Sequence, residues 1–138
     1  MAPESKFGFD VADREDVDAT ILLLKGPIDA FDTFSANGLK AVLTRWTNGG
    51  MDSKRRHLII DFDQVTYCGS SGWGILFQQS SLLRKQGRGM VLCAVNSRVG
   101  QSLRLLGNNA NLIQVAEHQA AAVETLSMFE MVQPTDEE

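Results

Sequence analysis

Short apolar runs alternate with stretches of helical periodicity along the chain, which predicts strands that are followed by helices. Runs of this length predict strands, and they cover residues 7–11, 19–24, 58–62, 90–95 and 112–116. An acidic turn at residues 13–16 joins the first two runs, and it is short enough for an antiparallel hairpin. The run at 58–62 has no polar alternation, which is typical of a strand covered on both faces.

Four segments have the spacing of amphipathic helices. The first covers residues 33–47, with Asp29 or Asp32 as a cap and Gly49-Gly50 as a stop. The second begins after Ser70-Ser71 and ends at residues 87–89. Asn96 or Ser97 caps a short third helix that stops at Gly107, and residues 119–128 form the fourth. Each of the first three helices has an apolar stripe that is expected to face inward. The stripes are Leu39, Val42, Leu43 and Trp46 in the first helix, Trp73, Leu76, Phe77, Ser80 and Leu83 in the second, and Val99, Leu103 and Leu106 in the third. In the second helix, Gln78, Gln79, Ser81 and Lys85 are expected to point mostly toward solvent.

This order of elements predicts one α/β domain. The expected sheet is mixed but mostly parallel, with four to five strands, an N-terminal antiparallel hairpin, about four helices and right-handed crossovers. The domain is expected to cover residues 6–128. Residues 129–138 are expected to form an acidic and flexible C-terminal tail.

Composition narrows the class of protein. A chain of 138 residues with 43% hydrophobic content is long enough for one core and too short for two ordinary domains. A formal charge of −4 argues against a nucleic-acid partner. Its one basic cluster, residues 54–56, is expected to be a solvated loop.

No segment has the ~20 apolar residues that membrane insertion needs, and the first residues lack a signal peptide. Cys68 and Cys93 are isolated and are interpreted as reduced core thiols. We therefore expect a cytoplasmic protein.

The most informative segment is residues 57–77, where a predicted strand leads into Gly69-Ser70-Ser71-Gly72 and a helical pattern begins at Trp73. This arrangement places two hydroxyls at a helix N-terminus, where backbone N–H groups and the helix dipole favour negative charge. Such a place can hold a phosphate, either on a ligand or on a serine. The simpler interpretation is that Ser70 or Ser71 only caps the helix.

Catalytic and metal-binding alternatives lack partners. The Gly-x-Ser-x-Gly spacing of a nucleophile elbow is absent, and His57 opens a strand at the end opposite the serines, so a Ser-His-Asp triad is disfavoured. The glycine-rich segment also lacks the motifs of nucleotide-binding loops. Asp61 and Asp63 can share one face of a strand, but no third ligand accompanies them. We expect no enzyme activity, no metal and no cofactor.

The serine is therefore better interpreted as a substrate than as a catalyst. Phosphorylation adds about −1.5 to −2 charge, which the N-terminal end of a helix dipole tolerates. The fold should survive the modification. The effect should fall on a partner that docks over the helix start, through repulsion and desolvation.

Four segments together resemble the STAS domain family, which includes bacterial anti-sigma-factor antagonists and the cytoplasmic part of sulphate transporters. They are residues 26–29, 60–67, 70–76 and 89–92, and the resemblance covers about residues 6–128. It implies a cytoplasmic binding protein without catalysis, which captures an anti-sigma factor that is also a serine protein kinase. The kinase would phosphorylate Ser70 and a serine phosphatase would reset it. The partner-binding residues that the resemblance implies are Gly26, Asp29, Gly69, Ser70, Ser71, Gly72, Trp73 and Gln78.

The chain departs from the family pattern at Gly69, where an acidic residue is usual before the phosphorylated serine. Ser71 is the fallback acceptor. The departure favours a second hypothesis, a constitutive STAS subunit or scaffold of a lipid-transport ATPase or stress-signalling complex that is not phosphorylated. A small enzyme or phosphate-ligand binder is a distant third.

Trp73 shares the apolar stripe of its helix, so we expect a core residue; an exposed indole would instead be a partner anchor. The sequence indicates no particular oligomeric state.

Overall fold

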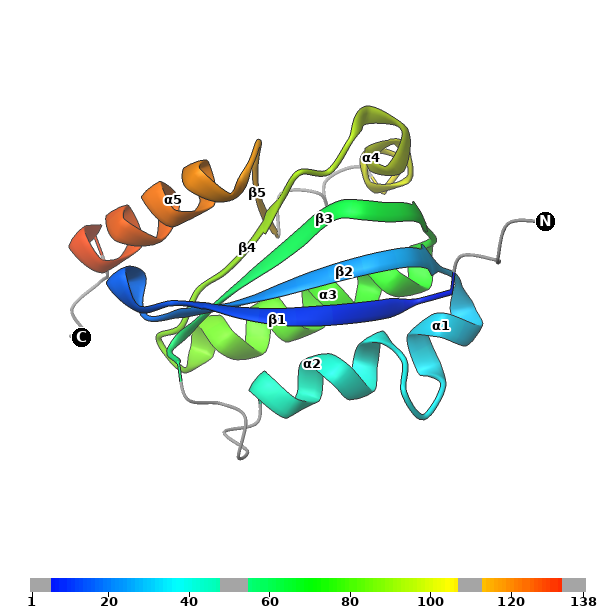
Figure 1. The fold of residues 1–138 in the computed structure, drawn as a ribbon, viewed down its shortest axis with the longest axis horizontal. Coiled ribbons are helices and arrows are strands. Elements are labelled where there is room, and N and C mark those ends of the chain that lie inside the picture. The colour runs from blue at the N-terminus through cyan, green and yellow to red at the C-terminus, as the bar shows by residue number, and fades with distance from the viewer. Residues whose placement is uncertain (1–5, 48–54, 107–112, 133–138) are drawn as a thin grey trace.

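The computed structural model describes residues 6–47, 55–106 and 113–132. Its strands form one sheet in the order β1-β2-β3-β4-β5 (Figure 1). The first pair is antiparallel and the other pairs are parallel, so the predicted α/β class with its N-terminal hairpin is confirmed. The strands are β1 (Gly8–Arg14), β2 (Ala19–Ile28), β3 (His57–Cys68), β4 (Met90–Cys93) and β5 (Gln114–Ala116).

The helices lie on both faces of this sheet. Helices α2 and α3 lie on one face and α5 lies on the other, while α4 lies at the end of β3 (Figure 1). A short 3-10 helix, η1 (Glu15–Val17), connects β1 to β2. The α-helices are α1 (Ala30–Phe34), α2 (Leu39–Thr47), α3 (Ser70–Lys85), α4 (Ser97–Arg104) and α5 (Gln119–Val132).

The central strands are buried on both faces, as the continuous apolar run of β3 predicted. Successive side chains of a strand point to opposite faces, so Ile60 and Phe62 join the core under α2 and α3, whereas Ile59 joins a smaller core under α5. The rings of Phe62 and Trp73 stack with centroids 5.3 Å apart. Both predicted core thiols, Cys68 and Cys93, are free and buried.

The helix predicted over residues 33–47 is two helices, separated at residues 35–38. Ser35 leaves helical geometry with an extended backbone. Gly38 then lies so close to the backbone of Asp32 that a Cβ on Gly38 would be 2.2 Å from the Asp32 carbonyl oxygen. Asp29 and Asp32 were alternative caps in the prediction, and they act together: each side chain accepts a hydrogen bond from the backbone N–H of the other.

Other boundaries also differ from the prediction. Strand β3 continues to Cys68 rather than ending at Phe62, and β4 ends at Cys93. Helix α5 runs to Val132, beyond the predicted end at residue 128. Gln79 was expected mostly toward solvent, but it is buried and accepts a hydrogen bond from the Thr47 hydroxyl of α2. The predicted stops at Gly49-Gly50 and Gly107, and the acidic tail at 133–138, lie outside the described residues.

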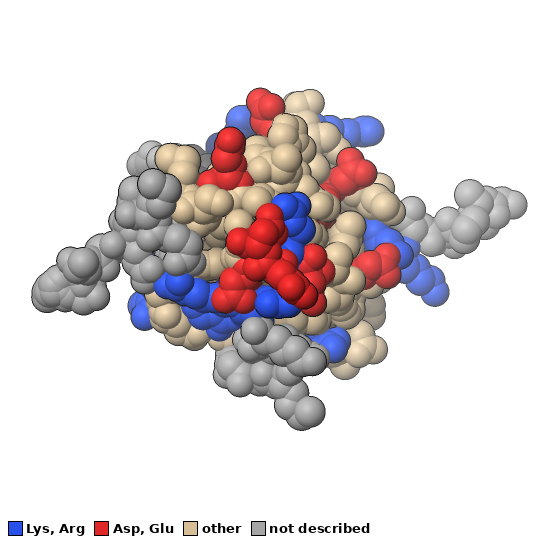
Figure 2. All heavy atoms as spheres, turned by 60° about the vertical axis from the view of Figure 1, so that its left-hand side comes forward, with Lys and Arg blue, Asp and Glu red and all other residues tan. Residues whose placement is uncertain are grey.

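Acidic side chains gather at the end of the molecule that holds η1 (Figure 2). Arg55, from the predicted basic cluster, lies 3.8 Å from the carboxylate of Asp13, 3.4 Å from that of Glu15 and 3.7 Å from that of Asp18. It is therefore ion-paired rather than simply solvated. This end lies opposite the double serine. His57 and Ala19 pair here at the starts of β3 and β2, whereas Ser70 follows the other end of β3.

Candidate functional site

The candidate site lies where the parallel strands β2 and β3 end. Ile28 pairs with Cys68 at this edge, and the N–H of Gly69 donates a 3.0 Å hydrogen bond to the carbonyl of Ile28. Helices α1 and α3 therefore begin side by side. This topology brings together two segments that sequence reasoning assigned to one site, residues 26–29 and 69–73.

Ser70 is the first residue of α3 and its side chain is exposed. The N-cap is Gly69, in an extended conformation, and no side chain caps the helix. The expectation that Ser70 or Ser71 is the cap is therefore wrong, because both serines already lie within the helix. An uncapped helix start keeps N–H groups and the positive end of the dipole directed at the surface around Ser70.

Ser71 has a different environment from its neighbour. It is half-buried, and its hydroxyl donates a 3.5 Å hydrogen bond to Oγ1 of Thr33 on α1. Thr33 is fully buried and in turn donates to the carbonyl of Asp29 at 2.8 Å. Ser71 thus faces α1, and Ser70 carries the more accessible hydroxyl of the pair.

Trp73 and Gly72 form the base of the site rather than its surface. The Trp73 side chain has an exposed fraction of 0%, which confirms the core interpretation and removes its indole from any exposed docking surface. Gly72 is also buried, and a Cβ there would lie 2.9 Å from Cys68 Sγ and 3.0 Å from Ile28 Cγ2. Both residues set the packing of α3 against β2 and β3.

The remaining predicted partner-binding residues have separate roles. Gly26 has a φ of +85°, and a Cβ there would lie 2.3 Å from the carbonyl oxygen of Lys6, so glycine is needed where β2 passes the start of the described chain. Asp29 caps α1, and the hydrogen bond from the Asp32 N–H lowers its pKa. Burial raises the pKa of Asp32. Gln78 is exposed on α3.

Asp61 and Asp63 lie in different environments. Asp61 is buried and its carboxylate accepts hydrogen bonds from Gln119 Nε2 at 2.6 Å and from the Asp63 N–H at 2.8 Å. Asp63 is exposed. The β2–β3 ladder shifts register between Leu23 and Lys25, which breaks the simple alternation that would give both carboxylates one environment. No cluster of three His, Cys, Asp or Glu side chains suited to a metal occurs among the described residues.

Both histidines accept hydrogen bonds from backbone N–H groups. His57 is buried at the far end of β3, where its Nδ1 accepts a 2.8 Å hydrogen bond from the N–H of Gly89. His118 Nδ1 accepts a 3.2 Å hydrogen bond from the N–H of Ala121 at the start of α5. Each imidazole thus makes a structural contact with the backbone.

Sequence reasoning missed several exposed apolar side chains on elements that adjoin α3. The exposed fractions are 75% for Phe31, 58% for Phe34, 52% for Tyr67 and 85% for Leu105. The two phenylalanines belong to α1, which contacts α3. Tyr67 and Leu105 line a groove of about 240 Å³ between β3 and α4. The i, i+3 spacing of Phe31 and Phe34 could have indicated their exposure only if α1 had been known to be too short to bury both rings. No feature of the sequence indicated that Leu105 is exposed.

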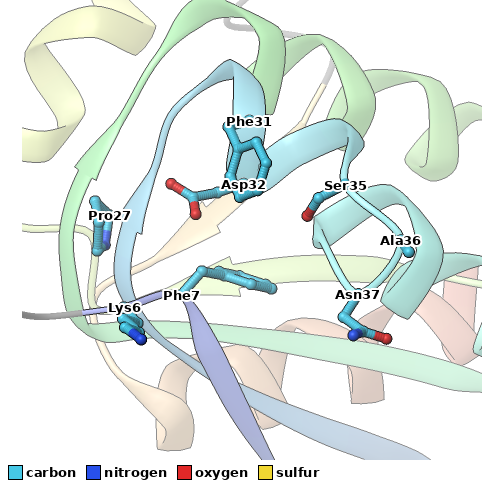
Figure 3. Close-up of a pocket in the computed structure, with 8 residues that line it drawn as sticks. All are labelled: Lys6, Phe7, Pro27, Phe31, Asp32, Ser35, Ala36 and Asn37. Atoms are coloured by element: carbon cyan, nitrogen blue, oxygen red, sulfur yellow. The ribbon is translucent and has the colours of Figure 1, made fainter.

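A larger hollow of about 760 Å³ opens between α1 and the beginning of β1 (Figure 3). Figure 3 shows the rings of Phe7 and Phe31 on different sides of this hollow, with Asp32 between them and Ser35 and Asn37 along one side. The hollow shares Phe31 with the exposed surface of α1. Its lining of rings with a few polar groups is typical of a surface that accepts another molecule.

The STAS domain family model matches residues 9–122, and the chain belongs to this family. No curated protein sequence matches it. An anti-sigma factor antagonist from Mycobacterium paratuberculosis has a similar structure, with 20% identity, a TM-score of 0.66 and coverage of 88% of this chain and 95% of that chain.

Two further solved structures share the fold. A sulfate transporter family protein from Wolinella succinogenes has 17% identity, a TM-score of 0.64 and coverage of 83% of this chain and 89% of that chain. The Bacillus cell fate determinant SpoIIAA, in its phosphorylated form, has 14% identity, a TM-score of 0.57 and coverage of 87% and 99% respectively. Within the described residues, every helix falls short of the length and apolar character needed to cross a membrane.

Proposed function

We propose that this protein is an anti-sigma-factor antagonist without catalytic activity. In this proposal it binds an anti-sigma factor that is also a serine protein kinase, through the surface around the start of α3. Phosphorylation of Ser70 switches the binding off and a serine phosphatase restores it. The similarity to an anti-sigma factor antagonist and to phosphorylated SpoIIAA supports this choice within the family.

The observation that carries the proposal is the position of Ser70 beside exposed apolar side chains. Ser70 is exposed at an uncapped helix start. Phe31 and Phe34 lie on the neighbouring helix α1, and Tyr67 lies two residues before Gly69 at the end of β3. Exposed aromatic side chains on adjoining elements are typical of a protein–protein interface.

This arrangement explains how one modification can control binding without altering the fold. The Ser70 side chain is exposed, so a phosphate there is solvated in the free protein and is tolerated by the helix dipole. In a complex, the same dianion would lie at an apolar interface and would have to be desolvated. The cost falls on the complex alone.

The second candidate is a constitutive STAS subunit or scaffold that is not phosphorylated. The similarity to a sulfate transporter family protein and the absence of a carboxylate at Gly69 favour it. In this case the surface around α3 is still used for docking. The Ser70 hydroxyl then remains unmodified.

Intact-mass spectrometry of the protein from its own cells, with peptide mapping across residues 57–84, separates the two candidates. The antagonist proposal expects one added phosphate on Ser70, which Ser70→Ala abolishes. Ser81→Ala is the matched control, because Ser81 is an exposed serine on the same helix; it should leave the phosphate in place. An unmodified protein under several growth and stress conditions would reject the phospho-switch.

Docking can be tested independently of phosphorylation. We expect tagged protein to capture an endogenous protein that mass spectrometry identifies as a serine kinase. Ser70→Glu should weaken this capture by introducing a charge, and Phe34→Ser should weaken it by removing an apolar contact. Val115→Ser is the control, because Val115 is an exposed apolar residue on β5 rather than on α1 or α3. Capture that is equal for all variants would contradict docking at this surface.

A further inference from the structure

We propose that Tyr67 is the positioning residue of the switch, with its phenolic hydroxyl donating a hydrogen bond to the phosphate oxygen atoms of modified Ser70. The phosphate is the partner, so the hydrogen bond forms after modification. This inference rests on the proposed phosphorylation of Ser70. It names the side chain that holds the phosphorylated product.

The first support is the contact between Tyr67 and Gly69. A Cβ on Gly69 would lie 3.0 Å from Tyr67 Oη, 3.4 Å from Cε2 and 3.5 Å from Cζ. The phenol therefore occupies the space that a side chain at position 69 would use. Gly69 is the N-cap of α3 and directly precedes Ser70, so the hydroxyl of Tyr67 lies at the cap position, one residue before the serine.

The second support is that both groups are available. Half of the Tyr67 side chain is exposed, at 52%, and within the described ranges no hydrogen bond joins Tyr67 Oη or Ser70 Oγ to another residue. By contrast, the hydroxyl of Ser71 is already directed to Thr33. The phenol is thus a donor without a competing partner in the described structure, placed beside the accessible serine.

The chemistry gives a measurable signature. A neutral O–H donor stabilises a phosphate dianion more than the monoanion, so the donor lowers the second pKa of the phosphate. Arg98 also lines the groove that contains Tyr67, and a cation there would lower the same pKa. The two contributions can be separated with Tyr67→Phe and Arg98→Gln.

The test uses full-length protein with phosphoserine incorporated at position 70 during synthesis, and it follows the phosphorus NMR resonance as a function of pH. Tyr67→Phe is expected to raise the second pKa of the phosphate by about half a unit, because the charged form loses one hydrogen bond. The matched control carries the phosphate on Ser81, also exposed on α3, and its pKa should not respond to Tyr67→Phe.

A second readout uses the fact that Tyr67 is the sole tyrosine of the chain. Its ring resonances should move when the phosphate is on Ser70 and should stay in place when the phosphate is on Ser81. A phosphate pKa on Ser70 that is equal with Tyr67 and with Tyr67→Phe would overturn the proposal, as would unmoved ring resonances. Since the phosphate is installed without a kinase, this result is independent of whether cells modify Ser70. Failure of the inference and failure of the proposed function are therefore distinguishable.

Discussion

The indole N–H of Trp73 donates a 2.7 Å hydrogen bond to the hydroxyl of Ser102, which joins the first turn of α3 to α4. The same hydroxyl donates to the carbonyl of Cys68, also at 2.7 Å, with the carbonyl of Val99 at 3.1 Å as an alternative acceptor. One side chain thus links β3, α3 and α4 directly beneath the segment that carries Ser70. These hydrogen bonds fix the positions of β3, α3 and α4 beneath the exposed Ser70.

Ser102→Ala should destabilise the protein by about 1–3 kcal/mol, because it leaves the buried indole N–H of Trp73 without an acceptor. Urea denaturation followed by circular dichroism measures this change in the free energy of unfolding. Ser81→Ala is the control, since Ser81 is exposed, and surface substitutions of this kind stay within about 0.5 kcal/mol. Equal stability of the two variants would contradict the structural role of Ser102.

Two glycines of α3 should respond to alanine in opposite directions. Gly72→Ala forces a Cβ to within 2.9 Å of Cys68 Sγ, and such overpacking costs about 1–3 kcal/mol. Gly74→Ala meets nothing within 4 Å, and alanine stabilises a helix by about 0.5–1 kcal/mol relative to glycine. Thermal unfolding of both variants checks the pair. A stabilising Gly72→Ala would show that α3 does not approach β2 as closely as described.

The buried contact between Thr47 and Gln79 should couple α2 to α3. Thr47→Val removes the donor to the Gln79 side-chain oxygen, and an unsatisfied buried polar group costs about 1–3 kcal/mol. Gln79→Met leaves the Thr47 hydroxyl without that acceptor. The double variant should lose less than the sum of the single changes, with a coupling energy of about 0.5–3 kcal/mol. Additive losses in a denaturant double-mutant cycle would argue against the contact.

The two thiols should be inert while the protein is folded. Burial raises the pKa of Cys68 to about 12, and burial, with Asp61 and Asp63, raises the pKa of Cys93 to about 12. Since the thiolate is the reactive form, iodoacetamide at pH 8 should label neither residue in native protein and both in urea. Native labelling as fast as in urea would contradict the burial of both thiols.

The same shifts predict how stability depends on pH. The folded state retains both thiol protons at pH values where the unfolded thiols, with an ordinary pKa of 9.0, ionise. Their contribution is fully present below pH 9, and the free energy of unfolding falls as the pH rises from 9 toward 12. Urea denaturation across this range measures the decline, and Cys68→Ala with Cys93→Ala should flatten it relative to the unmodified chain. An equally steep decline without both thiols would assign the effect to other groups.

The sequence by itself determined the order of the elements and the strand–serine–helix segment. Period-two and helical spacing decide which side chains can reach a core, so the strands, the hairpin and the burial of Trp73 could be predicted locally. The sequence offered Asn96 or Ser97 as a cap, and the structure has Asn96 in that role. The choice of Ser70 as the acceptor was a positional expectation. The structure adds that Ser71 is turned toward Thr33.

Tertiary packing alone decided the features that depend on distant segments. The split between α1 and α2 follows from the approach of Gly38 to the carbonyl of Asp32, and the burial of Gln79 follows from its partner Thr47 on another helix. The placement of Tyr67 over Gly69 depends on the extension of β3 beyond its apolar run. Hydrophobic periodicity records which side chains are buried, but it does not record which polar groups meet, because those contacts join residues far apart in the chain.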